Sequence, residues 1–396
     1  MSDLLSIEDA LAAVLGRVVP LEAEDVAVGD AAGRILTEPA RAAVDLPPFP
    51  SSAMDGFAVR AEDAPGELSV VARVAAGRPV DRALRAGEAI AIATGGVVPE
   101  GADAVVPVEN VEEVGDRVRI AADVSKKDNI RRRGGDVEAG ETVLGAGTRL
   151  GPAQVGALAA AGLATVACAR RPRAAVLATG TELRPPGAAL GPGEIYESNT
   201  FTLAAQLAHA GAVVERLAGV EDDEAATRDA LERGLAGDVL VTSGGVSVGP
   251  HDLVRSALVD LGAEEVFWRV AVRPGKPVAF AVGGRTLIFG LPGNPVSSLV
   301  GFELFVRPAL LALQGASDPR PPFRPARLGR SVRRSVARDA LVRGRSRVQD
   351  GAVVVDPVVG QESHMIVRAG HADALVSVEA GDGELAPGAV VSYLEM

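Results

Sequence analysis

Three short loops rich in glycine and hydroxyl side chains each follow an apolar stretch in the middle of the chain. They are Thr179-Gly-Thr-Glu182, Ser243-Gly-Gly-Val-Ser247 and Pro292-Gly-Asn-Pro295. Glycine lets the backbone approach a ligand closely, and the free N–H groups of such loops can bind an anion. The hydroxyls of Ser243 and Ser247 add donors. One such loop is equally an ordinary strand-to-helix connection, but three together favour a site for phosphate or an oxyanion.

Three carboxylates are expected near these loops at the edge of the sheet, namely Glu182, Asp222 and Asp252. Mg²⁺ is commonly held by one or two carboxylates together with phosphate oxygens. Asp222 and Asp252 are also explained as acids at helix starts, where the helix dipole favours negative charge. Taken together with Glu182, the set favours a magnesium site at a phosphate-binding edge.

The segment Arg273-Pro-Gly-Lys-Pro277 supplies cations on a backbone restricted by two prolines. Lysine acts as a compact charge on phosphate or an oxyanion. An exposed cationic turn is the alternative reading. A second basic feature runs from Arg320 to Arg347, where ten arginines stand with one acid, Asp339. That tract is either a solvated surface or a local site for a small anion.

Side chains for nucleophilic catalysis do not form a recognisable set in this sequence. No Ser-His-Asp or Cys-His arrangement emerges, and a Walker A motif is absent. The single cysteine, Cys168, stands among alanines and is expected in a core, and four scattered histidines cannot complete a zinc cluster. These absences argue against a P-loop NTPase and against a zinc site.

Composition excludes several classes of protein. With 396 residues, the chain is expected to form two to four domains. A formal charge of −12 argues against a general nucleic-acid binder. One cysteine allows no internal disulfide, which suits a reducing compartment. The N-terminus lacks the pattern of a signal peptide, and no apolar run approaches membrane-spanning length. We therefore expect a cytoplasmic protein with no membrane partner.

Alternating strand and helix patterns begin near Arg173 and predict an α/β domain with three layers. Such alternation implies a mainly parallel sheet covered by helices on both faces, and the three loops would then share the sheet edge where ligands bind. The expected strands are 174–178, 213–217, 239–241, 277–281 and 285–290, and the expected helices are 198–210, 222–235, 251–261 and 296–313.

The flanking regions have different patterns. Short β-branched segments with frequent turns predict an all-β module between about 69 and 150. It interrupts a helical region with expected helices at 6–18, 31–36 and 152–162, the last packing on the N-terminal helices. Ser6 is the expected N-cap of the first helix. After a proline-rich linker, the last seventy or so residues read as a small all-β domain.

Seven motifs carry a resemblance to a known family. They are Pro47–Arg60, Ala93–Val106, Asn129–Gly134, Thr179–Leu183, Ser243–Gly249, Pro274–Pro277 and Gly290–Ser297. In these motifs, and over essentially its whole length, the sequence resembles the MoeA family, the molybdopterin molybdenumtransferases, which include the gephyrin E domain. The resemblance implies a helical region (1–44 and 146–170), an inserted β-domain (45–145), an α/β domain (171–316) and a β-barrel-like C-terminal domain (320–396).

The resemblance also implies an activity. Such enzymes insert molybdenum from molybdate into adenylylated molybdopterin, and they hydrolyse the adenylate with a divalent cation, here expected to be Mg²⁺, releasing AMP and molybdenum cofactor. They form elongated homodimers whose active cleft combines the α/β domain of one subunit with the β-insertion of the other. A molybdopterin adenylyltransferase and molybdoenzymes are further expected partners.

Site residues follow from the same resemblance. Asp55, Thr94 and Lys276 join the three acids as catalytic positions, with Asp136 as a weaker match. Arg269 and Arg273 stand where relatives carry lysine. Arg343 and Ser363 match positions linked to molybdate, and Arg345 or Arg347 could replace Arg343. The implied substrate-binding set is Thr179, Gly180, Ser243, Gly244, Gly245, Ser247, Arg273, Pro292, Asn294, Pro295, Arg343 and Ser363.

Three other functions share parts of this pattern. The adenylyltransferase that makes the substrate has the same α/β fold, but it would lack the Asp55 motif and the flanking β-domains. A non-catalytic scaffold, as gephyrin is at synapses, would need additional domains and a long linker. A nucleotide-binding regulator built on the α/β module would need neither Lys276 nor the arginine tract.

Overall fold

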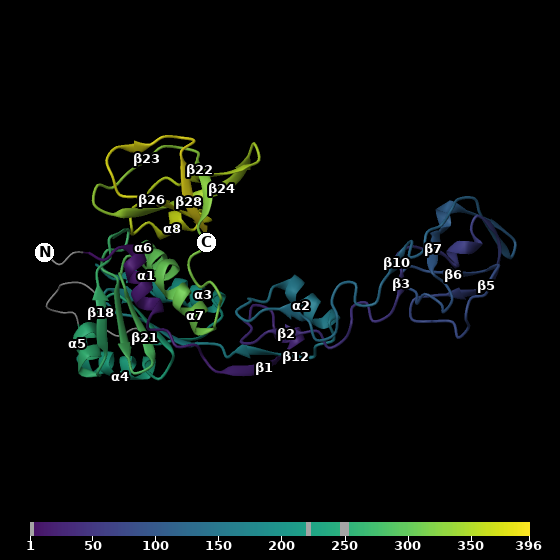
Figure 1. Ribbon diagram of the computed structural model, residues 1–396. Helices are drawn as coiled ribbons and strands as arrows, with labels where there is room; N and C mark the ends of the chain where they lie inside the picture. Colours follow the sequence, from purple (N-terminus) through teal and green to yellow (C-terminus); the bar gives the residue numbers. More distant parts are fainter. Residues whose placement is uncertain (1–3, 219–222, 246–252) are drawn as a thin grey trace.

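The computed structural model describes residues 4–218, 223–245 and 253–396. The molecule is elongated (Figure 1). An α/β body carries a β-rich C-terminal domain on one side, and a narrow linker joins it to a β-domain at the opposite end. These parts follow the predicted order along the chain, while the expected boundary residues stay predictions.

The α/β body is built on a six-stranded sheet in the order β16-β13-β17-β21-β20-β18. The first four strands are parallel, and β20 and β18 run antiparallel to their neighbours. The mainly parallel sheet predicted from the sequence is thus confirmed. The strands are β13 (Arg173–Ala178), β16 (Val213–Arg216), β17 (Val239–Ser243), β18 (Glu264–Trp268), β20 (Ala279–Gly283) and β21 (Thr286–Leu291).

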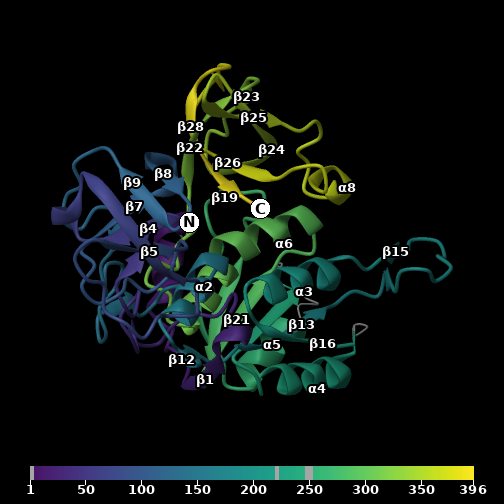
Figure 2. The same cartoon turned by 90° about the vertical axis from the view of Figure 1, so that its right-hand side faces the viewer.

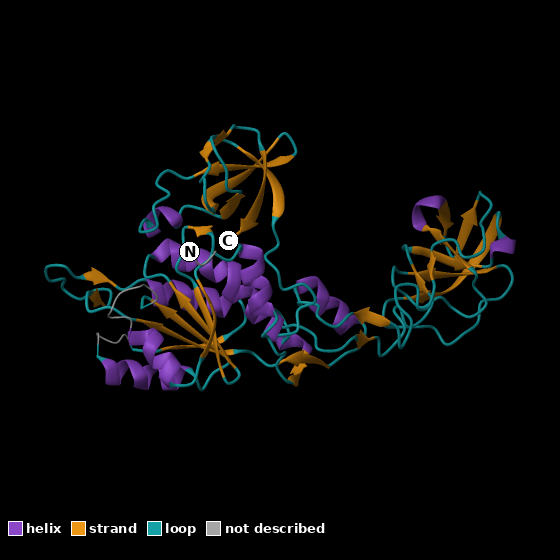
Figure 3. Ribbon diagram, turned by 60° about the vertical axis from the view of Figure 1, so that its left-hand side comes forward, coloured by secondary structure: helices purple, strands orange, loops and turns teal. Residues whose placement is uncertain are grey.

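Helices cover both faces of this sheet, as Figure 3 shows. Alternate strand residues explain why: Val176 and Val241 pack into one core, whereas Ala175 and Leu240 pack into the other. Helices α1 (Ile7–Leu15), α3 (Asn199–His209), α6 (Pro295–Gly301) and α7 (Arg307–Leu313) contribute to the first core, and α4 (Glu224–Gly234) and α5 (Leu253–Asp260) to the second. Because α3 and α4 lie on opposite faces, the crevice at the ends of β13 and β17 is the switch point where ligands bind in such sheets.

One long helical segment, Pro295–Leu313, runs through the α/β core. A π-helical turn, η4 (Phe302–Val306), joins α6 to α7 just before Pro308, which cannot donate a backbone hydrogen bond. Within the described part of the chain, this is the one helix whose length and composition would suit a membrane span, but 78% of that window is buried inside the protein. Its Arg307 and Glu303 form a two-bonded ion pair, at 2.5 and 2.9 Å.

The distal β-domain has a six-stranded sheet in the order β7-β4-β6-β5-β9-β8, which confirms the predicted all-β module. One short strand pair, β3 (Ser51–Ser52) with β10 (Ile130–Arg131), connects it to the linker. The 3₁₀ turns η2 (Ala61–Asp63) and η3 (Val108–Asn110) join its strands. The strands are β4 (Gly56–Val59), β5 (Gly66–Val74), β6 (Glu88–Ile92), β7 (Ala104–Pro107), β8 (Val111–Val114) and β9 (Arg117–Ile120).

The linker contains more strand than the sequence suggested. The ladder of β1 (Ala23–Ala27) with β12 (Thr165–Ala169) runs along it, followed by β2 (Ala40–Arg41) with β11 (Thr142–Leu144). The predicted helix at 31–36 was wrong. The chain forms a 3₁₀ turn, η1 (Val28–Asp30), and then turns at Gly33, whose φ is +78°. Ile35 and Leu36 form β-bridges instead, because their buried side chains pack in the linker.

The helix at 152–162 was predicted to pack on the N-terminal helices, and this was also wrong. It forms α2 (Pro152–Ala160), which contacts η1 and β11 in the linker. The N-terminal helix α1 instead packs against η4 and α7 in the α/β body, where Ala10 and Val14 are fully buried. Its N-cap is Ser6, as predicted, and the hydroxyl accepts from the Asp9 N–H.

The C-terminal domain is a small closed barrel. Strands β24, β25, β22, β28 and β26 follow one another, and β26 pairs again with β24. The α/β body joins this barrel directly, since β19 (Val272–Arg273) pairs with β24. The remaining elements are β22 (Arg324–Leu328), β23 (Val332–Arg333), β24 (Asp339–Gln349), β25 (Ala352–Pro357), α8 (Ile366–Ala369), β26 (Ala374–Val378), β27 (Glu384–Leu385) and β28 (Val390–Glu395).

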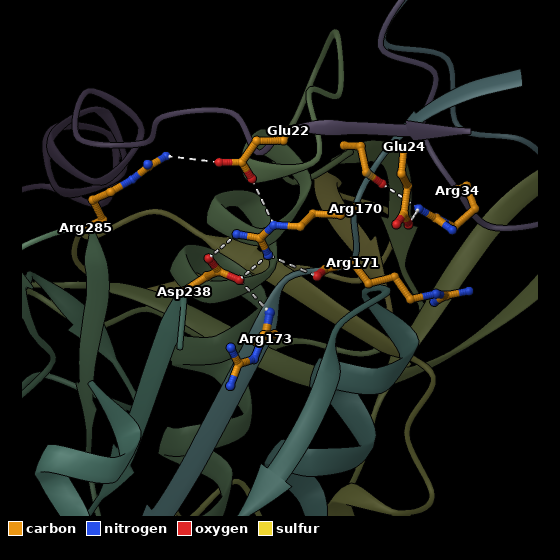
Figure 4. Close-up of polar contacts among 9 residues, drawn as sticks. Glu22, Glu24, Arg34, Arg170, Arg171, Arg173, Asp238 and Arg285 are labelled. Atoms are coloured by element: carbon orange, nitrogen blue, oxygen red, sulfur yellow. Dashed lines mark hydrogen bonds and ion pairs between the residues drawn. The ribbon is translucent and has the colours of Figure 1, made fainter. Parts of the chain in front are cut away.

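An ion-pair network lies where the linker leaves the α/β body (Figure 4). Arg170 donates two hydrogen bonds of 2.7 Å to the carboxylate of Asp238, and its Nε donates to Glu22 at 2.9 Å. Asp238 also accepts from the backbone N–H of Arg173 at 2.7 Å. Burial alone would raise the pKa of Asp238, but these bonds outweigh it and lower the pKa. Glu22 and Arg170 stand on the two chain segments that enter the linker. The network therefore ties both segments to Asp238, the residue just before β17.

Replacing Asp238 with asparagine should destabilise the protein by about 1–3 kcal/mol, because the paired cation loses its bidentate acceptor. The pKa of Asp238 is lowered in the fold, so this contribution is present above the ordinary carboxylate pKa and is lost as the pH falls through the folded value. Chemical unfolding near neutral pH should show the full deficit, and acidification should narrow it. Asp229→Asn, at an exposed position, is the control, and equal stability of the Asp238 variant would contradict the assignment.

Candidate functional site

Three loops meet at the carboxyl ends of β13, β17 and β21, as the sequence predicted. The N–H of Thr179 donates to the carbonyl of Ser243 at 3.2 Å, and the N–H of Gly244 donates to that of Leu291 at 3.1 Å. Gly244 has φ +91°, and a Cβ there would lie 2.8 Å from the carbonyl oxygen of Thr179. Only glycine therefore allows the first two loops to approach so closely.

Asn199 fastens the loops from the first turn of α3. Its Nδ2 donates to the hydroxyl of Ser243 and to the carbonyl of Gly293, both at 2.7 Å. The hydroxyl of Ser298 on α6 donates to the carbonyl of Pro292 and lies 3.3 Å from the hydroxyl of Ser243. Sequence reasoning missed Asn199 as a site residue. Its place at the start of α3, the helix that follows β13, is the signal that could have identified it.

Several backbone donors at this edge remain unused. The N–H groups of Gly180, Gly245, Gly293 and Asn294 have no acceptor among the residues that the structure describes. The oxygen Oδ1 of Asn199 is buried and likewise unpaired there. Unsatisfied donors gathered around glycine loops form a concave site for an anion. A groove of about 620 Å³, lined by Gly180, Arg184, Glu197, Phe201 and Arg216 among others, opens beside it.

Of the three predicted metal ligands, only Glu182 lies in the described part of the chain, since Asp222 and Asp252 fall outside it, as does Ser247. The Glu182 side chain is exposed and folds over Gly180, where a Cβ would lie 2.6 Å from its Oε2. The short pair β14 (Leu183–Arg184) with β15 (Ile195–Tyr196) holds the following segment, which projects from the body in Figure 2. No cluster of three metal-ligating side chains occurs among the described residues.

The Arg273–Pro277 turn lies against the start of α6, beside the third loop. Gly275 has φ +112°, and a Cβ there would meet the carbonyl and Cβ of Ser297 at 3.5 and 3.9 Å. The side chains of Arg273 and Lys276 are exposed at this turn. The guanidinium of Arg269 stacks on Trp268, 3.7 Å from the ring centroid. The turn brings Lys276 and Arg273 to the α6 end of the site.

Ser363 reaches the same place from the C-terminal domain. Its carbonyl accepts from the N–H of Val296, in the first turn of α6, at 3.0 Å. Arg343 is only 1% exposed, and it holds this segment by donating to the carbonyls of Gly360, Glu362 and Met365 at 2.9–3.2 Å. Burial lowers the pKa of Arg343. The structure thus shows a positioning role for Arg343, while direct contact of its side chain with an oxyanion stays a prediction.

The remaining predicted residues lie in the distal β-domain. The carboxylate of Asp55 accepts from both the N–H and the hydroxyl of Thr94, at 2.7 and 3.0 Å, and these two bonds lower the pKa of Asp55. The structure therefore brings together two residues that the resemblance gave as separate catalytic positions. Asp136 is exposed near the linker, and its N–H donates to the carbonyl of Leu46. Figure 1 and Figure 3 both place this domain at the far end of the molecule from the three loops.

Arg343→Met tests the positioning role. The substitution leaves the carbonyls of Gly360, Glu362 and Met365 without their donor, and an unpaired buried group costs about 1–3 kcal/mol. We expect lower thermal stability and faster amide exchange confined to residues 358–366. Arg345→Met, on the same strand but exposed, should change neither property. Wild-type exchange in the Arg343 variant would show that the guanidinium does not hold the segment.

Comparison with known proteins finds relatives along the whole chain. The family profile described as MoeA N-terminal region (domain I and II) matches residues 5–162, that of a probable molybdopterin binding domain matches 175–312, and that of MoeA C-terminal region (domain IV) matches 325–396. A protein named molybdopterin molybdenumtransferase 2, from Mycobacterium tuberculosis, is 42% identical over 322 residues, covering 78% of this chain and 79% of that one.

Two further relatives extend over nearly the full length. Molybdopterin molybdenumtransferase from Haemophilus influenzae is 34% identical and covers 98% of both chains. The crystal structure of the molybdopterin biosynthesis moeA protein from Pyrococcus horikoshii OT3 superposes with a TM-score of 0.85 at 27% identity, covering 100% of both chains. With the profiles in order and similarity over the full length, the chain belongs to the MoeA family.

Proposed function

We propose that this chain is a molybdopterin molybdenumtransferase, an enzyme of molybdenum cofactor biosynthesis that inserts molybdenum from molybdate into adenylylated molybdopterin. The observation that carries the proposal is the meeting of three loops with unused N–H donors beside the Lys276 turn. Relatives at 34–42% identity bear the name of this activity. A tetrahedral dianion and a phosphoanhydride both need such donors and cations.

The two kinds of donor suit two parts of the reaction. The N–H groups of Gly180 and Gly245 are placed to bind phosphate oxygens of the adenylylated substrate, which fixes its phosphoanhydride at the sheet edge. Lys276 and Arg273 suit molybdate at the α6 end of the site. Cleavage of the phosphoanhydride by water releases AMP and leaves the phosphate on the pterin product. Holding both substrates in fixed positions relative to one another lowers the entropic part of the activation barrier.

A magnesium ion fits this arrangement through Glu182. Its exposed carboxylate lies over Gly180, beside the donors proposed for phosphate, and Mg²⁺ typically combines one or two carboxylates with phosphate oxygens and water. When bound, the ion would neutralise charge on the phosphoanhydride. Asp222 and Asp252 are the further ligands implied by the family resemblance. Of these three acids, Glu182 is the one among the described residues, and it lies in the loop after β13. Its proposed role is to hold the ion at that side of the site.

The Asp55–Thr94 pair enters the proposal through a second subunit. Within one chain it lies at the opposite end of the molecule from the loops (Figure 1). An antiparallel homodimer would bring the β-domain of each subunit to the α/β body of the other, with the low pKa of Asp55 keeping an acceptor charged there. The proposal includes a cytoplasmic location, receipt of substrate from an adenylyltransferase and transfer of cofactor to molybdoenzymes.

Purified protein mixed with adenylylated molybdopterin, molybdate and Mg²⁺ tests the activity. The proposal requires AMP release that depends on molybdate, together with cofactor that reconstitutes an apo-molybdoenzyme. Synthesis of the adenylylated pterin from ATP would instead identify an adenylyltransferase. Nucleotide binding without turnover would identify a regulator or scaffold and would overturn the proposal.

The composite site is tested with differently tagged subunits that allow mixed dimers to be purified. A dimer of Asp55→Asn with Lys276→Ala should retain about half of the wild-type activity, because one of its two composite sites is intact. A dimer of the wild-type chain with the double variant should be inactive, since each site then receives one altered residue. The reverse result, an inactive first dimer and a half-active second, would place both residues in one subunit's site.

A further inference from the structure

A second basic cavity lies between the α/β body and the C-terminal barrel. Its volume is about 640 Å³. One wall is Arg273–Pro274, from the end of β19, and the opposite wall is the segment from Arg330 to Ser335, around β23. Strand β24 and residues 357–362 complete the lining. No described residue of the three glycine loops contributes to it, and it shares Arg273 with the site described above. We name it the interdomain groove.

Its charge is not neutralised by the protein. Arg273, Arg330 and Arg333 form no ion pair within the described part of the chain, and their side chains are exposed. Among the described residues that line the groove, Glu362 is the one acid, and it is also exposed. Like charges that share a cavity repel one another, and an anion bound between them removes that cost. The hydroxyls of Ser331 and Ser335 add neutral donors to the same wall.

The walls of the groove are held in place. Arg334, which also lines it, donates to the carbonyls of Glu379 and Ala380 at 3.1 and 2.8 Å. A Cβ at Gly381 would lie 2.5 Å from Cζ of Arg334, so glycine leaves room for this guanidinium. Below it, β19 pairs with β24, and Arg338 donates to the carbonyl of Val272 at 3.4 Å. The two domains therefore present their cations across a fixed gap.

The size of the groove decides the class of ligand. An inorganic oxyanion displaces only a few water volumes of about 30 Å³ each, so it would leave most of this space unfilled. Pockets for organic ligands measure about 300–1,000 Å³ and often lie between domains. The lining includes Val358, Val359 and Pro357 beside the cations, which suits a carbon skeleton. The arginines suit a phosphate, which accepts two parallel bonds from a guanidinium.

We propose that the interdomain groove binds a phosphorylated organic molecule of about mononucleotide size, with its phosphate on Arg330 and Arg333 and its skeleton between the two domains. The proposal does not require the activity assigned to the glycine-loop site. A ligand in this groove contacts both domains, so binding also resists their separation.

Equilibrium dialysis of the full chain with radiolabelled AMP tests the proposal, with adenosine and inorganic phosphate as competitors. Arg330→Ser/Arg333→Ser removes the groove cations. Arg320→Ser/Arg324→Ser removes the same charge from exposed positions nearby and serves as the control. The groove variant should lose one equivalent of bound AMP, or at least tenfold in affinity for it, whereas the control should match the wild type. Adenosine should not compete, and inorganic phosphate should compete at least tenfold more weakly than unlabelled AMP.

Stoichiometry separates this site from the glycine-loop site. If both bind AMP, the wild type takes two equivalents and the groove variant one. If only the groove does, the wild type takes one and the variant none, which supports the groove while removing support from the proposed function. Unchanged stoichiometry and affinity in the groove variant would overturn the groove proposal, as would equal competition by inorganic phosphate.

Discussion

Backbone N–H groups without an acceptor among the described residues are the constraint on which the candidate site depends. Those of Gly180, Gly245, Gly293 and Asn294 lie at the carboxyl edge of the parallel sheet, on loops that approach one another within hydrogen-bonding distance. Such closeness needs glycine, because a Cβ at Gly244 would collide with the backbone of Thr179. Asn199 and Ser298 then fasten the loops to α3 and α6. A concave set of donors held this firmly binds an anion without first reorganising, which is the property that catalysis of phosphoanhydride cleavage needs.

The second constraint is the elongated shape. The Asp55–Thr94 pair and the glycine loops are parts of one proposed site, yet they occupy opposite ends of the chain in Figure 1. The angle of the linker would then set whether two subunits can complete each other's sites. Where the linker leaves the α/β body, the guanidinium of Arg170 pairs with the carboxylates of both Asp238 and Glu22 (Figure 4). An ion-pair network at this position fixes the direction of the linker, and loss of the Asp238 carboxylate at its centre is expected to cost stability as well.

The arginines between residues 320 and 347 illustrate how one sequence feature separates into several physical roles. Arg343 is buried and organises the segment that carries Ser363. Arg334 and Arg338 tie loops and domains through backbone carbonyls. Arg330 and Arg333 remain exposed on the wall of the interdomain groove. Each of these arginines carries the same formal charge, but those without a partner among the described residues are the ones available to an external anion.

Much of the architecture follows from local sequence patterns. Alternating apolar segments predicted the parallel sheet and its two helical layers, because each strand residue must face one core or the other. Glycine and hydroxyl residues at strand ends predicted the loops, since parallel strands end at a common edge. The resemblance added Asp55 and Thr94 as catalytic positions, and the structure showed that they pair. The pattern failed where buried contacts outweighed local preference, as at Ile35 and Leu36, whose β-bridges replace the expected helix.

The sequence by itself therefore determined the order of domains, the parallel sheet and the residue types at the site, because periodicity and glycine spacing are local properties. Only the tertiary structure decided which residues meet. Asn199 lies 44 positions from Ser243 and 94 from Gly293, and no local signal predicts that one amide holds both. Likewise, the resemblance linked Arg343 to molybdate, whereas its burial beside three carbonyls shows which groups of the protein its guanidinium binds. Burial and partnership depend on the packing of distant segments, which sequence patterns do not contain.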